Sequence, residues 1–203
     1  MEYRTILMLL LVSGVTICMA IEEPSYKVIK SDGKIEIREY QSYIIAETFI
    51  STSDMDEASN AAFKKLFKYI SGNNSSKSDI AMTAPVTTTR SEKIEMTAPV
   101  STTRSADGYT VAFTLPMKYS LATSPTPTDS AIHLREVPSR IVAVIRFSGR
   151  WSESSMIEHE QELLQWMKNN GHTPGSIPVI ARYDPPFMPW FLRRNEIQIE
   201  VTK

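Results

Sequence analysis

The chain contains an internal repeat: a twelve-residue segment that begins at Ile35 returns 97 residues later, beginning at Ile132, with six of the twelve positions identical. Each copy has two runs of alternating apolar and polar residues around a short turn, and an amphipathic pattern follows. At the same offset Leu66 matches Leu163, and Ile80 matches Ile177. An internal repeat of this kind predicts two related β-β-α-β units.

Each unit contains one helix with a recognisable start and end. In the first unit Asp54, followed three residues later by a glutamate, predicts the N-terminus, and Ser71-Gly72 predicts the end. In the second unit Ser155 occupies the corresponding capping position, and Asn170-Gly171 ends the pattern. Apolar residues recur at helical spacing in both, so each helix has one face to bury.

Neither unit alone could bury both the apolar face of its helix and the apolar face of its sheet. The sequence therefore predicts an α+β fold, with a curved, antiparallel-rich sheet or distorted barrel flanked by two helices. The repeat halves, about 26–118 and 131–202, would be related by a pseudo-twofold axis with a groove where they meet. The proline-rich stretch 120–130 is then a surface connection inside one domain, 21–203.

A shorter repeat lies inside the first half. Residues 80–90 recur as 94–104, with nine of eleven positions identical. With a three-residue connection between them, the two copies predict an extra hairpin whose prolines keep it at an edge or bulge. A third strand, 109–115, follows the Asp107-Gly108 turn.

The first twenty residues read as a secretory signal. An apolar stretch from Ile6 to Ile17 precedes small residues up to Ala20, where cleavage is expected. We expect export to the periplasm, the cell envelope or the medium, and no membrane span after cleavage. Cys18 is the only cysteine, so a mature chain would lack disulfides and thiolate chemistry.

Composition and motifs argue against several classes of function. The chain has 22 basic and 23 acidic residues, which favours neither nucleic acid nor an anionic membrane as a partner. It lacks the glycine-rich phosphate motifs and the Gly-x-Ser-x-Gly elbow. His159-Glu160 lacks the second histidine of a zinc helix, and His133 and His172 read as surface residues. We therefore expect no catalytic and no metal-ligating residues.

The stretch 183–196 holds an aromatic cluster between three prolines, followed by Arg193 and Arg194. Stiff aromatic surface beside guanidinium groups suits a planar apolar ligand with carboxylate arms. The alternative is a loop that caps one end of the barrel, with Arg193 paired to Glu196.

Three segments together resemble the SOUL haem-binding family: Ile-Glu-Ile-Arg-Glu-Tyr at 35–40, Ile-Ala-Met-Thr-Ala-Pro-Val at 80–86, and Tyr-Asp-Pro-Pro at 183–186 leading to Arg-Arg-Asn-Glu at 193–196. The resemblance runs from about Tyr26 to Val201. It implies the same curved sheet with two helices, and tetrapyrroles such as haem or free porphyrin as ligands.

The resemblance also implies a groove between the first helix and the Tyr183–Arg194 loop. The matching positions are Asn60, Phe63, Lys64, Phe67, Lys68, Met188 and Arg193. Phe63 and Phe67 would face the macrocycle, while the lysines and Arg193 would meet the propionates. The alternative for the phenylalanines is ordinary core packing, which an i, i+4 pair fits equally well.

Glu39 stands where some relatives carry a histidine able to bind iron. Binding would then rest on burial of the macrocycle, and iron-free porphyrin would be accepted at micromolar affinity or weaker. This predicts a monomeric carrier, buffer or scavenger. The alternatives are a binder of another amphipathic small molecule and a protein-interaction module that uses the extra hairpin. An activity that modifies the tetrapyrrole also stays open.

Overall fold

The computed structural model describes residues 21–76 and 91–202. Two long helices, a short 3-10 helix and twelve strands follow one another along these ranges. Their order is β1 (Tyr26–Asp32), β2 (Ile35–Tyr40), β3 (Tyr43–Ile50), α1 (Met55–Ile70), β4 (Asn74–Ser75), β5 (Val100–Ser105), β6 (Gly108–Thr114), β7 (Thr126–Pro127), β8 (His133–Val137), β9 (Arg140–Phe147), α2 (Glu153–Asn169), β10 (Thr173–Pro174), β11 (Val179–Arg182), η1 (Trp190–Leu192) and β12 (Asn195–Thr202).

The strand order of the main sheet is symmetric when corresponding strands of the two repeat halves are matched. Its order is β1-β2-β9-β12-β11-β5-β6-β3-β8, and each neighbouring pair in this order is antiparallel. Strands β2, β9, β12 and β11 of one side correspond to β8, β3, β6 and β5 of the other. The pseudo-twofold axis predicted from the repeat therefore passes between β11 and β5, and β1 is an addition at one edge.

The two halves exchange their first strands. Strand β2 pairs with β9 of the second half, in the register Ile37↔Ala143. Strand β8 pairs with β3 of the first half, in the register Ile45↔Arg135. Each half therefore completes its sheet with a strand from the other, which confirms that the two halves form one sheet.

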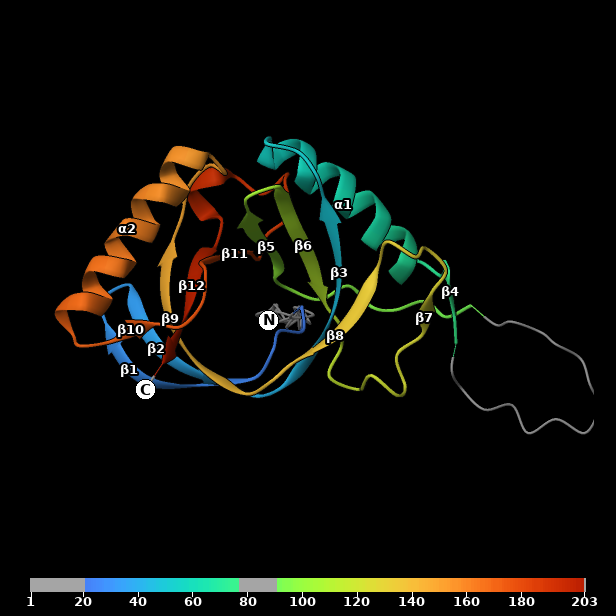
Figure 1. The fold of residues 1–203 in the computed structure, drawn as a ribbon, viewed down its shortest axis with the longest axis horizontal. Helices are drawn as coiled ribbons and strands as arrows, with labels where there is room; N and C mark the ends of the chain where they lie inside the picture. The colour runs from blue at the N-terminus through green and yellow to red at the C-terminus, as the bar shows by residue number, and fades with distance from the viewer. Residues whose placement is uncertain (1–20, 77–90, 203) are drawn as a thin grey trace, which may run out of the picture.

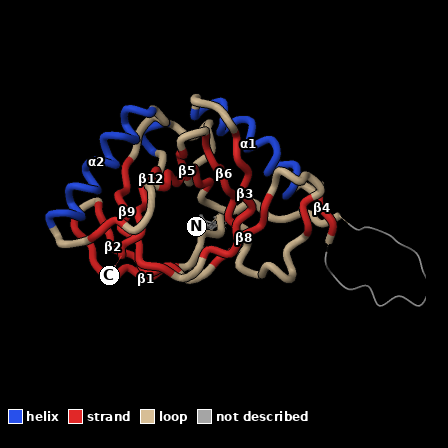
Figure 2. Tube along the Cα trace, viewed as in Figure 1, coloured by secondary structure: helices blue, strands red, loops and turns tan. Residues whose placement is uncertain are grey.

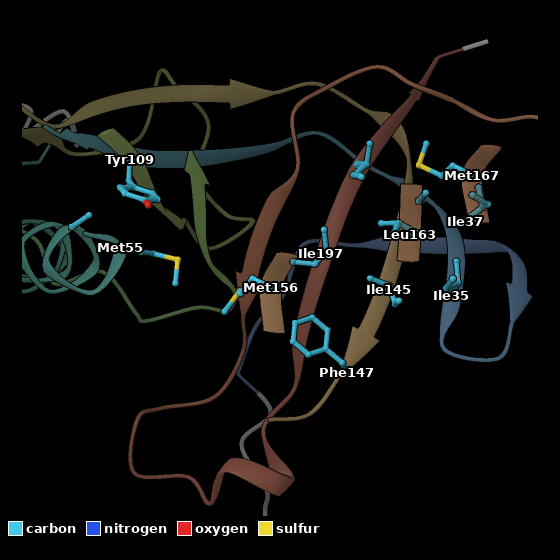
Figure 3. Packing of buried hydrophobic residues seen from close by; sticks show 13 residues of the cluster. Ile35, Ile37, Met55, Tyr109, Ile145, Phe147, Met156, Leu163, Met167 and Ile197 are labelled. Carbon is cyan, nitrogen blue, oxygen red and sulfur yellow. The ribbon is translucent and has the colours of Figure 1, made fainter. Parts of the chain in front are cut away.

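Both helices lie on the outer side of the arched sheet, α1 over one half and α2 over the other (Figures 1 and 2). Beneath α1 a core forms from Ala62, Leu66 and Tyr69 against β3 and β6. Beneath α2 a second core extends across the pseudo-axis, because Met55 and Tyr109 of the first half join it (Figure 3). The fold is thus α+β with two helices on one curved sheet, as the repeat predicts.

The starts of the two helices test the capping predictions. The Asp54 carboxylate accepts from the backbone N–H groups of Asp56 and Glu57, and α1 ends at Ile70, as predicted. The predicted start at Ser155 is wrong by one turn. The N-cap of α2 is Ser152, whose hydroxyl accepts from the Ser155 N–H, so Ser155 lies inside the first turn.

Only the second copy of the short repeat falls on described residues. Residues 77–90, which hold the whole first copy, lie outside them. The second copy supplies β5, which pairs with β6 and β11 inside the main sheet rather than in an extra hairpin. The turn into β6 needs glycine at 108, because its φ is +153° and a Cβ there would lie 2.1 Å from the Ile50 carbonyl oxygen.

The connection between the halves is anchored to the surface. Its short strand β7 pairs with β4, and the Tyr69 hydroxyl donates to the Pro125 carbonyl at 2.9 Å. No helix in the described ranges is long and apolar enough to cross a membrane.

Candidate functional site

The face of α1 beside its core stripe carries two partly exposed phenylalanines. Phe63 is 40% exposed and Phe67 is 46% exposed, so neither is an ordinary core residue. Their rings are nearly parallel, with centroids 5.8 Å apart and planes 10° apart. The rings of Phe63 and Phe113 of β6 meet edge to face, with their centroids 5.3 Å apart. This contact holds the pair against the sheet. The pair therefore offers a fixed aromatic surface to solvent.

The polar residues predicted for the same site lie beside this pair. Asn60, Lys64 and Lys68 are spaced four residues apart on α1, and all three are exposed. Residues at this spacing share one side of a helix. The five helical positions inferred from the resemblance thus form one continuous surface of α1.

The loop between β11 and β12 carries the other two predicted residues, Met188 and Arg193. Four large apolar side chains of this loop are exposed, namely Phe187, Trp190, Phe191 and Leu192. Met188 is half-buried. An exposed group of this size on a monomer is characteristic of an interaction site.

Arg193 holds this loop together. Its Nε donates to the Met188 carbonyl at 2.8 Å, and its Nη2 donates to the Pro186 carbonyl. The guanidinium also lies 4.5 Å from the ring centroid of Trp151. Arg193 and Met188 are therefore brought together, but through the main chain, and two donors of Arg193 are already engaged.

The first and third of the family-like segments, 35–40 and 183–196, meet inside the arch, on the side of the sheet away from the helices, while 80–86 lies outside the described residues. There Arg38 donates Nη1 and Nη2 to the two oxygens of Glu196, at 3.0 and 3.1 Å. Glu196 also accepts from Arg194, Tyr183 and Gln198. The alternative pairing of Arg193 with Glu196 is wrong, because it is the neighbouring Arg194 that turns inward.

The charges of this inner network are balanced by direct contact. Burial alone would raise the pKa of Glu196, but the charges of Arg38 and Arg194 and the hydrogen bonds around it lower that pKa overall. Burial raises the pKa of Tyr40, beside Arg38, to about 12. Every partner is engaged, so these motif residues stabilise the fold.

Arg182, at the end of β11, contacts α1 and was missed by sequence reasoning. It is 8% exposed and lies on the helix side of the sheet, where its Nη1 donates to the Ser59 hydroxyl of α1 at 3.2 Å. Its guanidinium lies 4.8 Å from the ring centroid of Trp151. In the described part of the chain its Nε and Nη2 have no hydrogen-bond partner. Burial lowers the pKa of Arg182, and the charge of Asp56 opposes this shift.

A separate shallow pocket opens on the inner side of the first half. Its volume is about 60 Å³, and its walls include Tyr43, Glu47, Arg135 and Arg140. Arg135 and Glu47 form a two-bond ion pair there, with both distances 2.9 Å. Ligand pockets measure roughly 300–1,000 Å³, so this one is too small for a macrocycle.

The described residues hold no group of three or more histidine, cysteine, aspartate or glutamate side chains that could bind a metal ion. His133 is exposed. His159 contacts the Ser155 carbonyl oxygen through Nδ1 and stacks on Phe147, and His172 stacks on Trp166. The three histidines thus have ordinary structural environments.

Comparison with known proteins finds similarity over most of the chain. A family model described as SOUL heme-binding protein matches residues 21–200. Heme-binding protein 1 of Xenopus tropicalis is 29% identical over 162 residues, which cover 80% of each chain. Heme-binding protein 2 of Homo sapiens is 26% identical over 189 residues, 87% of this chain and 88% of the human protein.

Solved structures share the fold at low identity. The EcmrR C-terminal domain superposes with a TM-score of 0.57 at 12% identity, covering 88% of this chain and 98% of that domain. A hydrolase from Listeria innocua superposes with a TM-score of 0.56 at 10% identity, covering 86% and 94%. At these identities the likeness concerns the arrangement of sheet and helices alone.

Proposed function

Because the chain belongs to the SOUL heme-binding protein family, we propose that it binds haem or iron-free porphyrin without catalysing a reaction. The binding surface lies between α1 and the loop from Tyr183 to Arg194. The stacked, partly exposed pair Phe63 and Phe67 carries this proposal. A structural pair would be buried, whereas this one keeps about half of its aromatic surface available to a planar ligand.

The remaining residues of the surface fit such a ligand. Lys64 and Lys68 are exposed beside the phenylalanines and can meet carboxylate arms, while Asn60 adds a neutral hydrogen-bonding group. The exposed apolar side chains of the loop, with Met188 at their base, can cover more of the macrocycle. Arg193 supports this surface by holding the loop main chain.

The surface predicts loose binding. Covering roughly 400 Å² of apolar ligand surface yields ~10 kcal/mol at about 25 cal/mol per Å². Lost freedom on association costs at least ~4 kcal/mol, which leaves at most ~6 kcal/mol, a dissociation constant of roughly tens of micromolar or weaker. Such an affinity suits a carrier, buffer or scavenger, and it does not require an iron ligand.

A titration of residues 21–203 with haem and with protoporphyrin IX tests this function. Absorbance reports haem, and fluorescence reports the free porphyrin. Saturable binding of both, weakened at least tenfold in Phe63→Ala/Phe67→Ala, is the expected result. The matched control is Phe49→Ala, since Phe49 is 46% exposed on β3, away from α1.

Two results would count against the proposal. Neither ligand binding at tens of micromolar protein would remove tetrapyrroles as the ligand class. Equal weakening by Phe49→Ala and by the double variant would remove α1 as the site. A mixed panel of amphipathic compounds in competition with protoporphyrin IX would identify a different ligand class.

We also propose that binding takes place outside the cytoplasm, because residues 1–20 have the pattern of a secretory signal. Expression of the full chain should yield an exported protein whose mass corresponds to a start at Ile21. An uncleaved chain retained in the cytoplasm would contradict export.

A further inference from the structure

Arg182 is a buried cation whose best hydrogen-bonding edge is unused. Its Nη1 donates to Ser59, but Nε and Nη2 have no partner in the described ranges. These two nitrogens lie on one edge of the planar guanidinium. That edge matches the two oxygens of a carboxylate, so the unused donors are arranged for a bidentate anion.

The free edge is unfavourable as the structure stands. Unpaired donors that are removed from water lose hydrogen bonds without compensation, and the loss is larger for a charged group. Arg182 feels the charge of Asp56, yet the two side chains form no ion pair. Perturbed charged groups of this kind are concentrated at binding sites.

Arg182 shares one aromatic neighbour, Trp151, with a second arginine. The guanidinium groups of Arg182 and Arg193 both lie against the Trp151 ring, at 4.8 and 4.5 Å from its centroid. The indole Nε1 donates to Asn195 at 2.8 Å, so Trp151 is fixed and offers no acceptor. Because Arg193 is itself a cation and already donates to the Met188 and Pro186 carbonyls, neither it nor Trp151 supplies an acceptor for the free edge of Arg182.

Arg182 lies at one end of the phenylalanine surface. Across the sheet it is the register partner of Val100, and Val100 is the partner of Phe113. Phe113 packs against Phe63 on the helix side of the sheet. On α1, Ser59 precedes Phe63 by one turn, so the residue that Arg182 contacts and the aromatic pair share one side of the helix.

We infer that the Nε–Nη2 edge of Arg182 receives a carboxylate of the bound tetrapyrrole, with the macrocycle on Phe63 and Phe67. This inference rests on the proposed function and assigns the propionate a buried partner that the resemblance does not supply. The exposed Lys64 and Lys68 then have the lesser role, since solvent screens their charges.

The test compares protoporphyrin IX with its dimethyl ester, which keeps the macrocycle and removes both carboxylates. The wild-type protein should bind the diacid roughly ten- to a hundredfold more tightly, as expected for a bidentate bond to a charged group. Arg182→Met should bind the two ligands with equal affinity. Arg182→Lys keeps the charge without the fork and should retain only part of the preference.

The outcomes separate this inference from the proposed function. Wild-type protein that binds neither ligand would overturn both. Wild-type protein that binds both ligands equally, or an Arg182→Met variant that keeps the preference for the diacid, would overturn the role of Arg182 alone. In Arg193→Met, which loosens the loop, the two ligands should weaken by the same factor.

Thermal unfolding without ligand tests whether Arg182 instead has a structural role. If the free edge is unpaired, Arg182→Met should unfold at the same temperature as the wild type or higher. Asp56→Asn should leave the preference for the diacid in place. A fall of several degrees in both variants would identify Asp56 as the true partner and overturn the inference.

Discussion

Arg38 and Glu196 form a two-bond ion pair inside the arch, Nη1 to Oε2 at 3.0 Å and Nη2 to Oε1 at 3.1 Å, between strands that are 158 residues apart in the chain. The side chains are 3% and 0% exposed. The pair joins β2 of the first half to β12 of the second. It therefore links the two halves at the point where they exchange strands.

Removing one partner of this pair should strongly destabilise the protein. In Arg38→Met the carboxylate of Glu196 keeps Arg194 but loses its two-bond partner. Breaking a buried pair costs about 3–5 kcal/mol of unfolding free energy. Urea unfolding at pH 7 measures the loss.

The repeat provides a matched control for this experiment. Arg135 occupies the position in β8 that Arg38 occupies in β2, and it binds Glu47 through two bonds of 2.9 Å. The Arg135 side chain is 52% exposed, so Arg135→Met should cost less than about 1 kcal/mol. A loss as large as that in Arg38→Met would show that burial is not what makes the inner pair important.

The inner network should also set the acid stability. The pKa of Glu196 lies below its ordinary value of 4.5 in the folded chain, because the arginines outweigh the effect of burial. The unfolded chain then binds a proton at higher pH than the folded chain. Stability is therefore present above about pH 4.5 and is lost as the pH falls toward the folded pKa.

Comparison of two proteins isolates this contribution. Between pH 7 and pH 3.5 the unfolding free energy of the wild type should fall more steeply than that of Glu196→Gln, which cannot take up this proton. Parallel pH curves would mean that other carboxylates dominate the acid response.

Much of the fold follows from local patterns in the sequence. The cap at Asp54 and the stop at Ser71 match α1 as it is formed, because both signals act within a turn of the helix. For α2 the pattern of Ser155 with a glutamate three residues later pointed one turn too far along the chain, because the helix is capped by Ser152, which has no glutamate at that spacing. The exchange of β2 and β8 could not be predicted, since alternation is the same whichever strand lies alongside.

The candidate site was predictable only in part. Helical spacing brings Phe63 and Phe67 together, but their exposure depends on what the sheet beneath leaves uncovered. Arg193 and Arg194 are adjacent, and the start of β12 decides which one faces Glu196. Arg182 follows an apolar strand, and its unused edge becomes visible only when α1 is in place above it.

The exchanged strands predict that neither half folds alone. A fragment of residues 21–128 lacks β9 as the partner of β2, and a fragment of residues 129–203 lacks β3 as the partner of β8. Each would expose unpaired strand edges and part of its core. Neither should show a cooperative thermal transition by circular dichroism, whereas an equimolar mixture should recover one. A cooperative transition in either isolated half would contradict the dependence.

Arg193 should control the opening of the loop rather than global stability. Arg193→Ala removes the hydrogen bonds to Met188 and Pro186, so the segment from Pro186 to Leu192 should open about tenfold more often. Chymotrypsin reports this opening, because Phe187, Trp190 and Phe191 lie in the segment and are exposed. Cleavage there should accelerate while the unfolding temperature changes little. Arg150→Ala is the control, since the Arg150 guanidinium lies 5.9 Å from the Trp190 ring centroid and carries the same charge. Equal acceleration in both variants would show that loss of positive charge, and not loss of the bonds to the loop, opens the segment.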